Sequence, residues 1–141
     1  MTVSLFLGKE ELQMQKAQYG ILRFAKYKGP EISNIEAHNE RKKEKYASNP
    51  DIDNSRRNLN YHFIEPVGKY RAESNRLIEE YGCRTRKDSV RVVEVLITAT
   101  PEFFKGKKKS EIRAYFQTAL EFIEKYQDSE TILSAVVHMD E

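Results

Sequence analysis

The sequence has few of the features that mark secreted or membrane proteins. Its one cysteine, Cys83, excludes an internal disulfide framework and fits a reducing cytoplasm. No stretch approaches the roughly 20 apolar residues that a membrane-spanning helix needs. The apolar stretch Val3–Leu7 is too short for a secretory signal and lacks the basic start and small-residue cleavage site. The sequence also lacks internal repeats and low-complexity segments. Together these features lead us to expect a globular protein of the cytoplasm.

The length and charge of the chain narrow the options further. With 141 residues it is long enough for one domain with a core and too short for two. The net charge of +2 says little, but the basic residues are grouped into short runs. Clustered positive charge favours an anionic polymer as partner, although each run taken singly is also typical of a solvated surface. The runs are Arg41–Lys45, Arg56–Arg57, Arg84–Lys87 and Lys105–Lys109.

Hydrophobic periodicity predicts alternating strands and helices around one sheet, an α/β sandwich. A capping box of Ser33 and Glu36 predicts the start of the first helix, and Gly82 is well placed to end the second. The nearly continuous apolar residues from Val90 are typical of a central strand buried on both faces. Ser110 is predicted to cap a third helix with a clean core-facing stripe. The expected strands are 18–26, 59–64, 90–98 and 131–138, and the expected helices follow Ser33, Lys69 and Ser110.

The last strand ends in a polar cluster. The apolar run from Ile132 to Val137 is followed by His138, Asp140 and Glu141. Imidazole and carboxylate fixed to the end of a rigid strand can form half of a divalent-metal site, with His138 and Glu141 as ligands. The alternative is a solvated strand end without a ligand.

A second group of functional side chains falls on the first helix. His38, Arg41 and Lys45 are spaced by three and four residues, so a helix would carry them on one face, near Lys42. A guanidinium one turn from an imidazole suits phosphate chemistry, because the guanidinium can grip a phosphate while the imidazole attacks it or moves a proton. The alternative is a polar surface helix with an incidental histidine.

Four motifs together resemble the plasmid mobilisation relaxases of the MobV type, also called Mob/Pre proteins or plasmid recombination enzymes. The resemblance extends from Tyr19 to Glu141. It implies a relaxase fold, in which a single sheet with an antiparallel centre is flanked by helices, and an Mn²⁺- or Mg²⁺-dependent action on plasmid DNA. The motifs are His38-Asn39-Glu40-Arg41, Ser55-Arg56 with Leu59-Asn60-Tyr61, Arg86-Lys87-Asp88-Ser89-Val90 and Val137-His138-Met139-Asp140-Glu141.

The resemblance implies a role for each motif. His38 would be the nucleophile that attacks the scissile phosphate of a single-stranded or hairpin transfer origin, and Arg41 would clamp that phosphate. Tyr61 is the second candidate nucleophile, because tyrosine does this in related relaxases, and its alternative role is packing against a helix. The expected DNA contacts are Lys42, Lys45, Arg56, Asn60, Arg84, Arg86 and Lys87.

The chain departs from the family pattern at its end. The metal motif of the family continues with Pro-His-x-His, which would follow Glu141, so the predicted site at His138 and Glu141 is incomplete. We therefore expect residues 14–141 to be the N-terminal portion of a relaxase domain that binds DNA but nicks little or not at all. The alternative function is a non-catalytic DNA-binding remnant. A rolling-circle replication initiator would share the chemistry but not the Asn60-Tyr61 and Arg86-Lys87-Asp88 pattern.

The first residues fit this domain poorly. Gly8-Lys9-Glu10-Glu11 can be encoded by a bacterial ribosome-binding sequence just ahead of Met14. We expect translation to start at Met14, which would make residues 1–13 a non-native or disordered extension.

Overall fold

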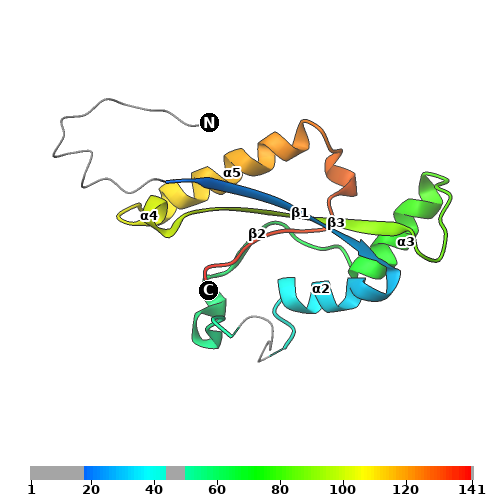
Figure 1. The fold of residues 1–141 in the computed structure, drawn as a ribbon, viewed down its shortest axis with the longest axis horizontal. Coiled ribbons are helices and arrows are strands. Elements are labelled where there is room, and N and C mark those ends of the chain that lie inside the picture. Colours follow the sequence, from blue (N-terminus) through cyan, green and yellow to red (C-terminus); the bar gives the residue numbers. More distant parts are fainter. Residues whose placement is uncertain (1–17, 44–49, 141) are drawn as a thin grey trace.

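A computed structural model describes residues 18–43 and 50–140 (Figure 1). The predicted extension 1–13 lies outside these residues, as do Lys45 and Glu141. Strand β1 (Gly20–Lys28) pairs antiparallel with β3 (Val90–Ala99), and β2 (Tyr61–Ile64) pairs antiparallel with β4 (Ala135–Val137). The predicted antiparallel arrangement with flanking helices is confirmed. The expected single sheet is divided, within the described ranges, into two sheets of two strands.

The β1–β3 pair is less buried than its sequence suggested. Its register runs from Gly20 opposite Ala99 to Tyr27 opposite Val92, with a bulge beyond Tyr27. Val93 and Leu96 are 51% and 48% exposed. The prediction of a strand buried on both faces is therefore wrong, because the described helices cover these faces only in part.

The first helix, α2 (Ile32–Asn39), begins earlier than predicted. A 3₁₀ turn, η1 (Gly29–Glu31), leads directly into it, and the backbone N–H of Lys28 donates to the Glu31 carboxylate at 2.8 Å. Ser33 lies inside the helix rather than at its cap, so the predicted capping box is wrong. Glu36 is buried and accepts the backbone N–H of Tyr70 at 2.6 Å, which joins α2 to the next helix.

Helix α3 (Tyr70–Glu80) ends as its sequence predicted. Gly82 adopts a left-handed φ of 64° and donates its N–H to the Glu79 carbonyl at 3.1 Å. Glycine reaches this backbone region at little steric cost. The chain then passes through the exposed residues 81–88 into β3.

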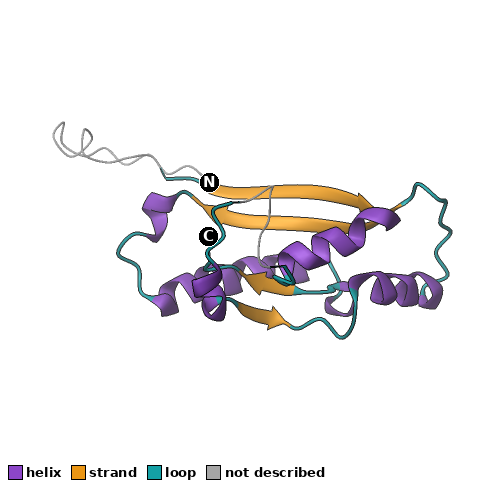
Figure 2. Ribbon diagram, turned by 90° about the horizontal axis from the view of Figure 1, so that it is seen from below, coloured by secondary structure: helices purple, strands orange, loops and turns teal. Residues whose placement is uncertain are grey.

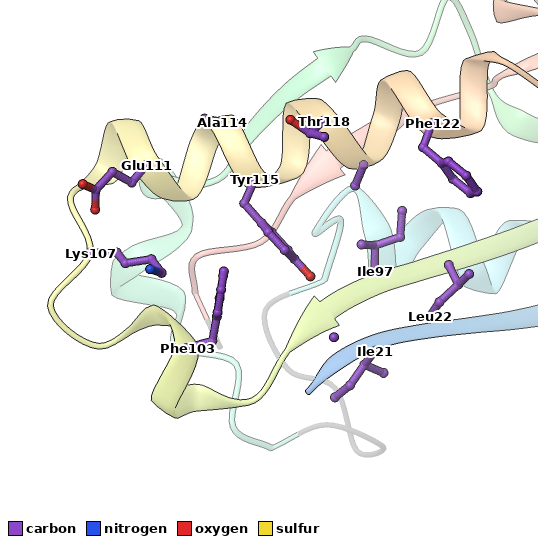
Figure 3. Close-up of a pocket in the computed structure, with 12 residues that line it drawn as sticks. Ile21, Leu22, Ile97, Phe103, Lys107, Glu111, Ala114, Tyr115, Thr118 and Phe122 are labelled. Carbon is purple, nitrogen blue, oxygen red and sulfur yellow. The ribbon is translucent and has the colours of Figure 1, made fainter. Parts of the chain in front are cut away.

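Helices α4 (Pro101–Phe104) and α5 (Lys109–Glu124) follow β3. Lys108, not Ser110, is the N-cap of α5, and its backbone N–H donates to the Glu111 carboxylate at 3.0 Å. The Tyr115 hydroxyl donates to the Thr98 carbonyl at 3.0 Å and so attaches α5 to β3. An open apolar groove of about 670 Å³ lies between the start of β1, α4 and α5 (Figure 3). The predicted stripe is half-buried: Ile112, Tyr115, Phe116, Ala119, Leu120 and Ile123.

Helices α5 and α2 lie on opposite sides of the strands (Figure 1). The β2–β4 pair lies between them, because Arg113 of α5 contacts Tyr61 and Phe63 of β2 while Glu40, next to α2, contacts His62. The buried apolar residues Ile32, Ile35 and Tyr70 gather where α2 meets α3, and Val137 of β4 is also buried. Figures 1 and 2 show the loop after α3 at one end of the elongated molecule and the C-terminus toward the other end. No helix in the described part of the chain is long and apolar enough to cross a membrane.

Candidate active site at the ends of α2 and β4

The C-terminal end of α2 lies against the end of β4. His138 Nε2 is 2.7 Å from the carbonyl oxygen of Asn39, the last residue of α2. His38 precedes Asn39 in the final turn, and its Nδ1 is 3.5 Å from the Asn39 side-chain oxygen. The fold thus brings together two segments that lie 99 residues apart in the sequence.

A buried ion pair fastens this junction. The Arg41 guanidinium binds the Asp140 carboxylate through both oxygens, with Nε at 2.8 Å from Oδ2 and an Nη at 3.0 Å from Oδ1. The other Nη donates to the carbonyl oxygen of His38 at 2.6 Å. The two side chains are 5% and 0% exposed. In this structure Arg41 therefore joins the end of α2 to Asp140, just beyond β4. Its role as a phosphate clamp stays a prediction.

The backbone around Arg41 explains its direction. Helix α2 ends at Asn39, and Arg41 has a φ of 51°, in the left-handed region that non-glycine residues seldom occupy. The predicted helical face of His38, Arg41 and Lys45 would need two more helical turns. The reversal at Arg41 instead aims the guanidinium back across the helix end toward Asp140.

Two further contacts hold Met139 and Asp140. The carbonyl oxygen of Asp140 accepts the backbone N–H of Asp53 at 2.7 Å, and the N–H of Met139 donates to Asn60 Oδ1 at 2.7 Å. Burial would raise the pKa of Asp140, but the hydrogen bonds from Arg41 and Asn60 outweigh it and bring the pKa to about 2. Asn60, predicted to contact DNA, supports the C-terminal segment in this structure.

A largely buried carboxylate, that of Glu40, links four segments beside the same junction. It accepts hydrogen bonds from His62 Nε2 at 2.6 Å, from the Ser134 hydroxyl at 2.8 Å and from the Tyr70 hydroxyl. Burial opposes ionisation, but these bonds lower the pKa of Glu40 below its ordinary value. Sequence reasoning missed this network because its partners come from β2, α3 and the approach to β4. Its one local signal was the position of Glu40 between His38 and Arg41.

Tyr61 lies on the other face of the β2–β4 pair. His62 points to Glu40, so the neighbouring side chain of Tyr61 alternates to the opposite face. Its ring is 5.5 Å from that of Phe63, and the guanidinium carbon of Arg113 lies 4.8 Å from its centre. Burial raises the pKa of Tyr61. The structure therefore does not bring the second candidate nucleophile to the α2 end.

The predicted DNA contacts are dispersed. The Lys42 ammonium pairs with the buried Glu36 and stays partly exposed. Arg56 is exposed in the 3₁₀ turn η2 (Asn54–Leu59), which leads into β2. The loop that carries Arg84, Arg86 and Lys87 is at the far end of the molecule from the C-terminus (Figure 1). The predicted contacts therefore do not form one surface.

The metal ligands are brought together only in part. His138 lies at the junction, Glu141 falls outside the described residues, and both oxygens of Asp140 bind Arg41. Within residues 18–43 and 50–140 no group of three His, Cys, Asp or Glu side chains could hold a metal ion. These residues alone thus do not complete a metal site.

The arrangement of helices and antiparallel strands is that of a relaxase domain. The chain matches a solved MobM relaxase domain bound to plasmid pMV158 oriT DNA, in an Mn-bound crystal structure at pH 6.8, with a TM-score of 0.80 and 30% identity. This match covers 87% of the chain and 65% of that domain. A second structure of the MobM domain with a 22-nucleotide oriT DNA, at pH 5.5, gives a TM-score of 0.77 at 29% identity.

A sequence profile of the plasmid recombination enzymes, Mob_Pre, matches residues 16–141, so the chain belongs to this family. It is 35% identical over 128 residues to plasmid recombination enzyme type 1 of Staphylococcus aureus and 35% identical over 127 residues to the enzyme of Lactiplantibacillus plantarum. Each match covers 87% of the chain, but only 32% and 35% of those relatives. The chain thus spans about a third of their length, and the resemblance found in its motifs is confirmed.

Proposed function

We propose that the chain binds plasmid origin DNA, single-stranded or as a hairpin, and contributes the ends of α2 and β4 to a DNA-nicking site. The observation that carries this proposal is the 2.7 Å contact between His138 and the carbonyl of Asn39, which puts the His38 motif beside the His138 motif. Because plasmid DNA is the proposed partner, we place the protein in the cytoplasm. Residues 14–141 are the proposed portion of the relaxase domain.

His38 is the proposed nucleophile. A ring nitrogen of His38 would attack the phosphorus of the scissile phosphodiester and form an N–P bond, which leaves the phosphate attached to the 5′ end of the downstream strand. The bond from phosphorus to the 3′ oxygen breaks in the same substitution, and that oxygen leaves as a 3′ hydroxyl after taking a proton. Arg41 and Asp140 support this step by fixing the end of α2, since a nucleophile displaced by about 1 Å can lose two orders of magnitude in rate.

The cofactor that this function implies is Mn²⁺ or Mg²⁺. The solved relatives are Mn-bound, and His138 with Glu141 is the share of the ligands that we assign to this chain. Such an ion would polarise the non-bridging phosphate oxygens. The described residues do not complete the ligand set of this ion. The proposed reaction is therefore described through the side chains of His38, Arg41 and Asp140.

DNA binding without nicking is the second candidate function. It is favoured by the use of both Asp140 oxygens by Arg41, which leaves His138 as the side chain at the described junction that could face a metal ion. On this interpretation the chain keeps its basic surface and binds DNA in a strongly salt-dependent way.

One experiment separates the two candidates. The 141-residue chain is incubated with 5′- and 3′-labelled oligonucleotides covering the plasmid transfer origin, with Mn²⁺ or with EDTA, and covalent adducts are resolved on denaturing gels. Adducts that are lost in His38→Ala and kept in Tyr61→Phe support the histidine nucleophile, and adducts that persist in His38→Ala overturn it. Binding without adducts, the result expected for these 141 residues, supports the second candidate. A chain that binds no origin DNA refutes both.

A further inference from the structure

We propose that the α4–α5 basic surface, made by Lys105, Lys107, Lys108, Lys109 and Arg113, is where this chain grips the phosphates of the DNA strand next to the candidate site. The inference rests on the proposed function and deepens it, because it assigns the DNA path to residues that none of the four family motifs contains. It also predicts that the Arg84–Lys87 loop contributes little.

The α4–α5 basic surface has a high density of exposed positive charge. Its five basic residues fall within nine positions, 105 to 113, and all are exposed. None of the carboxylates in the described ranges forms an ion pair with them. The nearest acid in the sequence, Glu111, uses its carboxylate to accept the backbone N–H of Lys108 at 3.0 Å. The positive charge is therefore available to an anionic partner.

Aromatic rings hold two of these cations in place. The Arg113 guanidinium carbon lies 4.8 Å from the ring centre of Tyr61 and 4.9 Å from that of Phe63. The Lys107 ammonium lies 4.6 Å from the ring centre of Phe103, at one end of the open groove (Figure 3). A ring face attracts a cation without occupying its N–H donors as a carboxylate does. The donors are thus positioned in advance and can still bind phosphate oxygens.

The position of Arg113 connects this surface to the candidate site. Tyr61, which lies beneath the guanidinium, pairs with Val137 at the end of the β2–β4 register, and the next residue is His138. Figure 1 shows the connection between α4 and α5 at the same end of the molecule as the C-terminus. Arg113 is on the face of β2 opposite His62 and the α2 end, so a strand held at the α2 end would pass round this end of the β2–β4 pair to reach Arg113 and then Lys107. The Arg84–Lys87 loop is at the opposite end of the molecule.

The test compares two variants of the whole chain that lose the same charge from opposite ends. One is the triple variant Lys105→Gln, Lys107→Gln, Lys109→Gln, and the other is Arg84→Gln, Arg86→Gln, Lys87→Gln. Binding of a fluorescent 22-nucleotide single strand and of a matching hairpin is measured by anisotropy between 0.05 and 0.5 M salt. Each lost phosphate contact lowers the slope of log affinity against log salt by about 0.7 for a single strand. Three lost contacts lower the slope by about 2, or the affinity by about 100-fold at 0.1 M salt.

The expected result is a slope that falls for the 105/107/109 variant and stays near that of the unaltered chain for the 84/86/87 variant. The reverse result, or an equal loss in both, overturns the inference while leaving DNA binding established. No salt-dependent binding by the unaltered chain would overturn the inference and the proposed function together. Arg113→Gln tests the surface apart from the lysines, and thermal unfolding by circular dichroism checks that each variant is folded. The comparison of single strand with hairpin shows which form supplies the phosphates.

Discussion

Replacing Asp140 by asparagine should destabilise the fold strongly, although the change removes almost no volume. The Asp140 carboxylate is fully buried and accepts two hydrogen bonds from Arg41, whose side chain is 5% exposed. In Asp140→Asn the amide oxygen can still accept one of these bonds, but the amide nitrogen then faces a guanidinium donor. The guanidinium is left in a buried site without its counter-charge.

The expected size of this effect follows from the pKa of Asp140. The pKa falls from 3.8 to about 2 on folding, which corresponds to about 2 kcal/mol of preference for the ionised carboxylate. Removing one partner of a buried ion pair typically costs about 3–5 kcal/mol, because the remaining charge stays desolvated. We therefore expect Asp140→Asn to lower the free energy of unfolding by about 3 kcal/mol. That is a large share of the roughly 5–15 kcal/mol of a typical domain.

Urea unfolding followed by circular dichroism at pH 7 measures this loss. With an m-value of about 2 kcal/mol per M, the midpoint should fall by about 1.5 M. The matched control is Arg76→Gln, since Arg76 also forms two charged hydrogen bonds, to Glu73 at 3.0 Å and to Glu80 at 2.6 Å, but its side chain is 54% exposed. Exposed pairs contribute at most about 1 kcal/mol. A midpoint for Asp140→Asn no lower than that of the control would refute the argument that burial makes this pair important.

Three further changes, in pH or in sequence, test the contacts and backbone described above. Folding lowers the pKa of Asp140, so its contribution to the free energy of unfolding is complete above about pH 4 and is lost as the pH falls toward 2. When the free energy of unfolding is measured across this pH range, the pH dependence should be weaker in Asp140→Asn than in the unaltered chain. Glu40→Gln should lower the free energy of unfolding by about 1–3 kcal/mol in the same assay, because the His62, Ser134 and Tyr70 donors lose a charged acceptor; an unchanged midpoint would contradict the network. Gly82→Ala should cost about 1 kcal/mol because of the φ of 64°, and a stabilised variant would show that the α3 end relaxes.

Local sequence signals predicted the elements well. Periodicity located β1, α3, β3 and α5 to within a few residues, and Gly82 marked the end of α3, because these features depend on neighbours a few positions away. The helix starts were less accurate. Ser33 and Ser110 have the residue type of a cap, but Gly29-Pro30 and Lys108 start the helices first, and the choice among adjacent candidate caps depends on packing.

The tertiary contacts could not be predicted in this way. Segments far away in the sequence decide how many strands pair with β3 and how well its faces are covered. The apolar composition of β3 therefore did not reveal that Val93 and Leu96 are about half exposed. The partners of Glu40 lie up to 94 residues away and carry no spacing that would mark them. The motif resemblance named residues that lie at the junction, but it did not predict which of them contact each other.

The prediction and the structure differ most at Arg41, where the helical spacing and the observed backbone point the side chain in opposite directions. Three residues separate Arg41 from His38, and a continuous helix would have carried both side chains outward on one face toward DNA. Because α2 ends at Asn39 and Arg41 turns to a φ of 51°, the guanidinium instead lies inside the protein with Asp140. In our proposal the phosphates are met instead by exposed cations, the lysines before α5 and Arg113 above Tyr61. The same reversal lies beside the contact between His138 and Asn39, so in our proposal the motif positions His38 while the basic surface holds the strand.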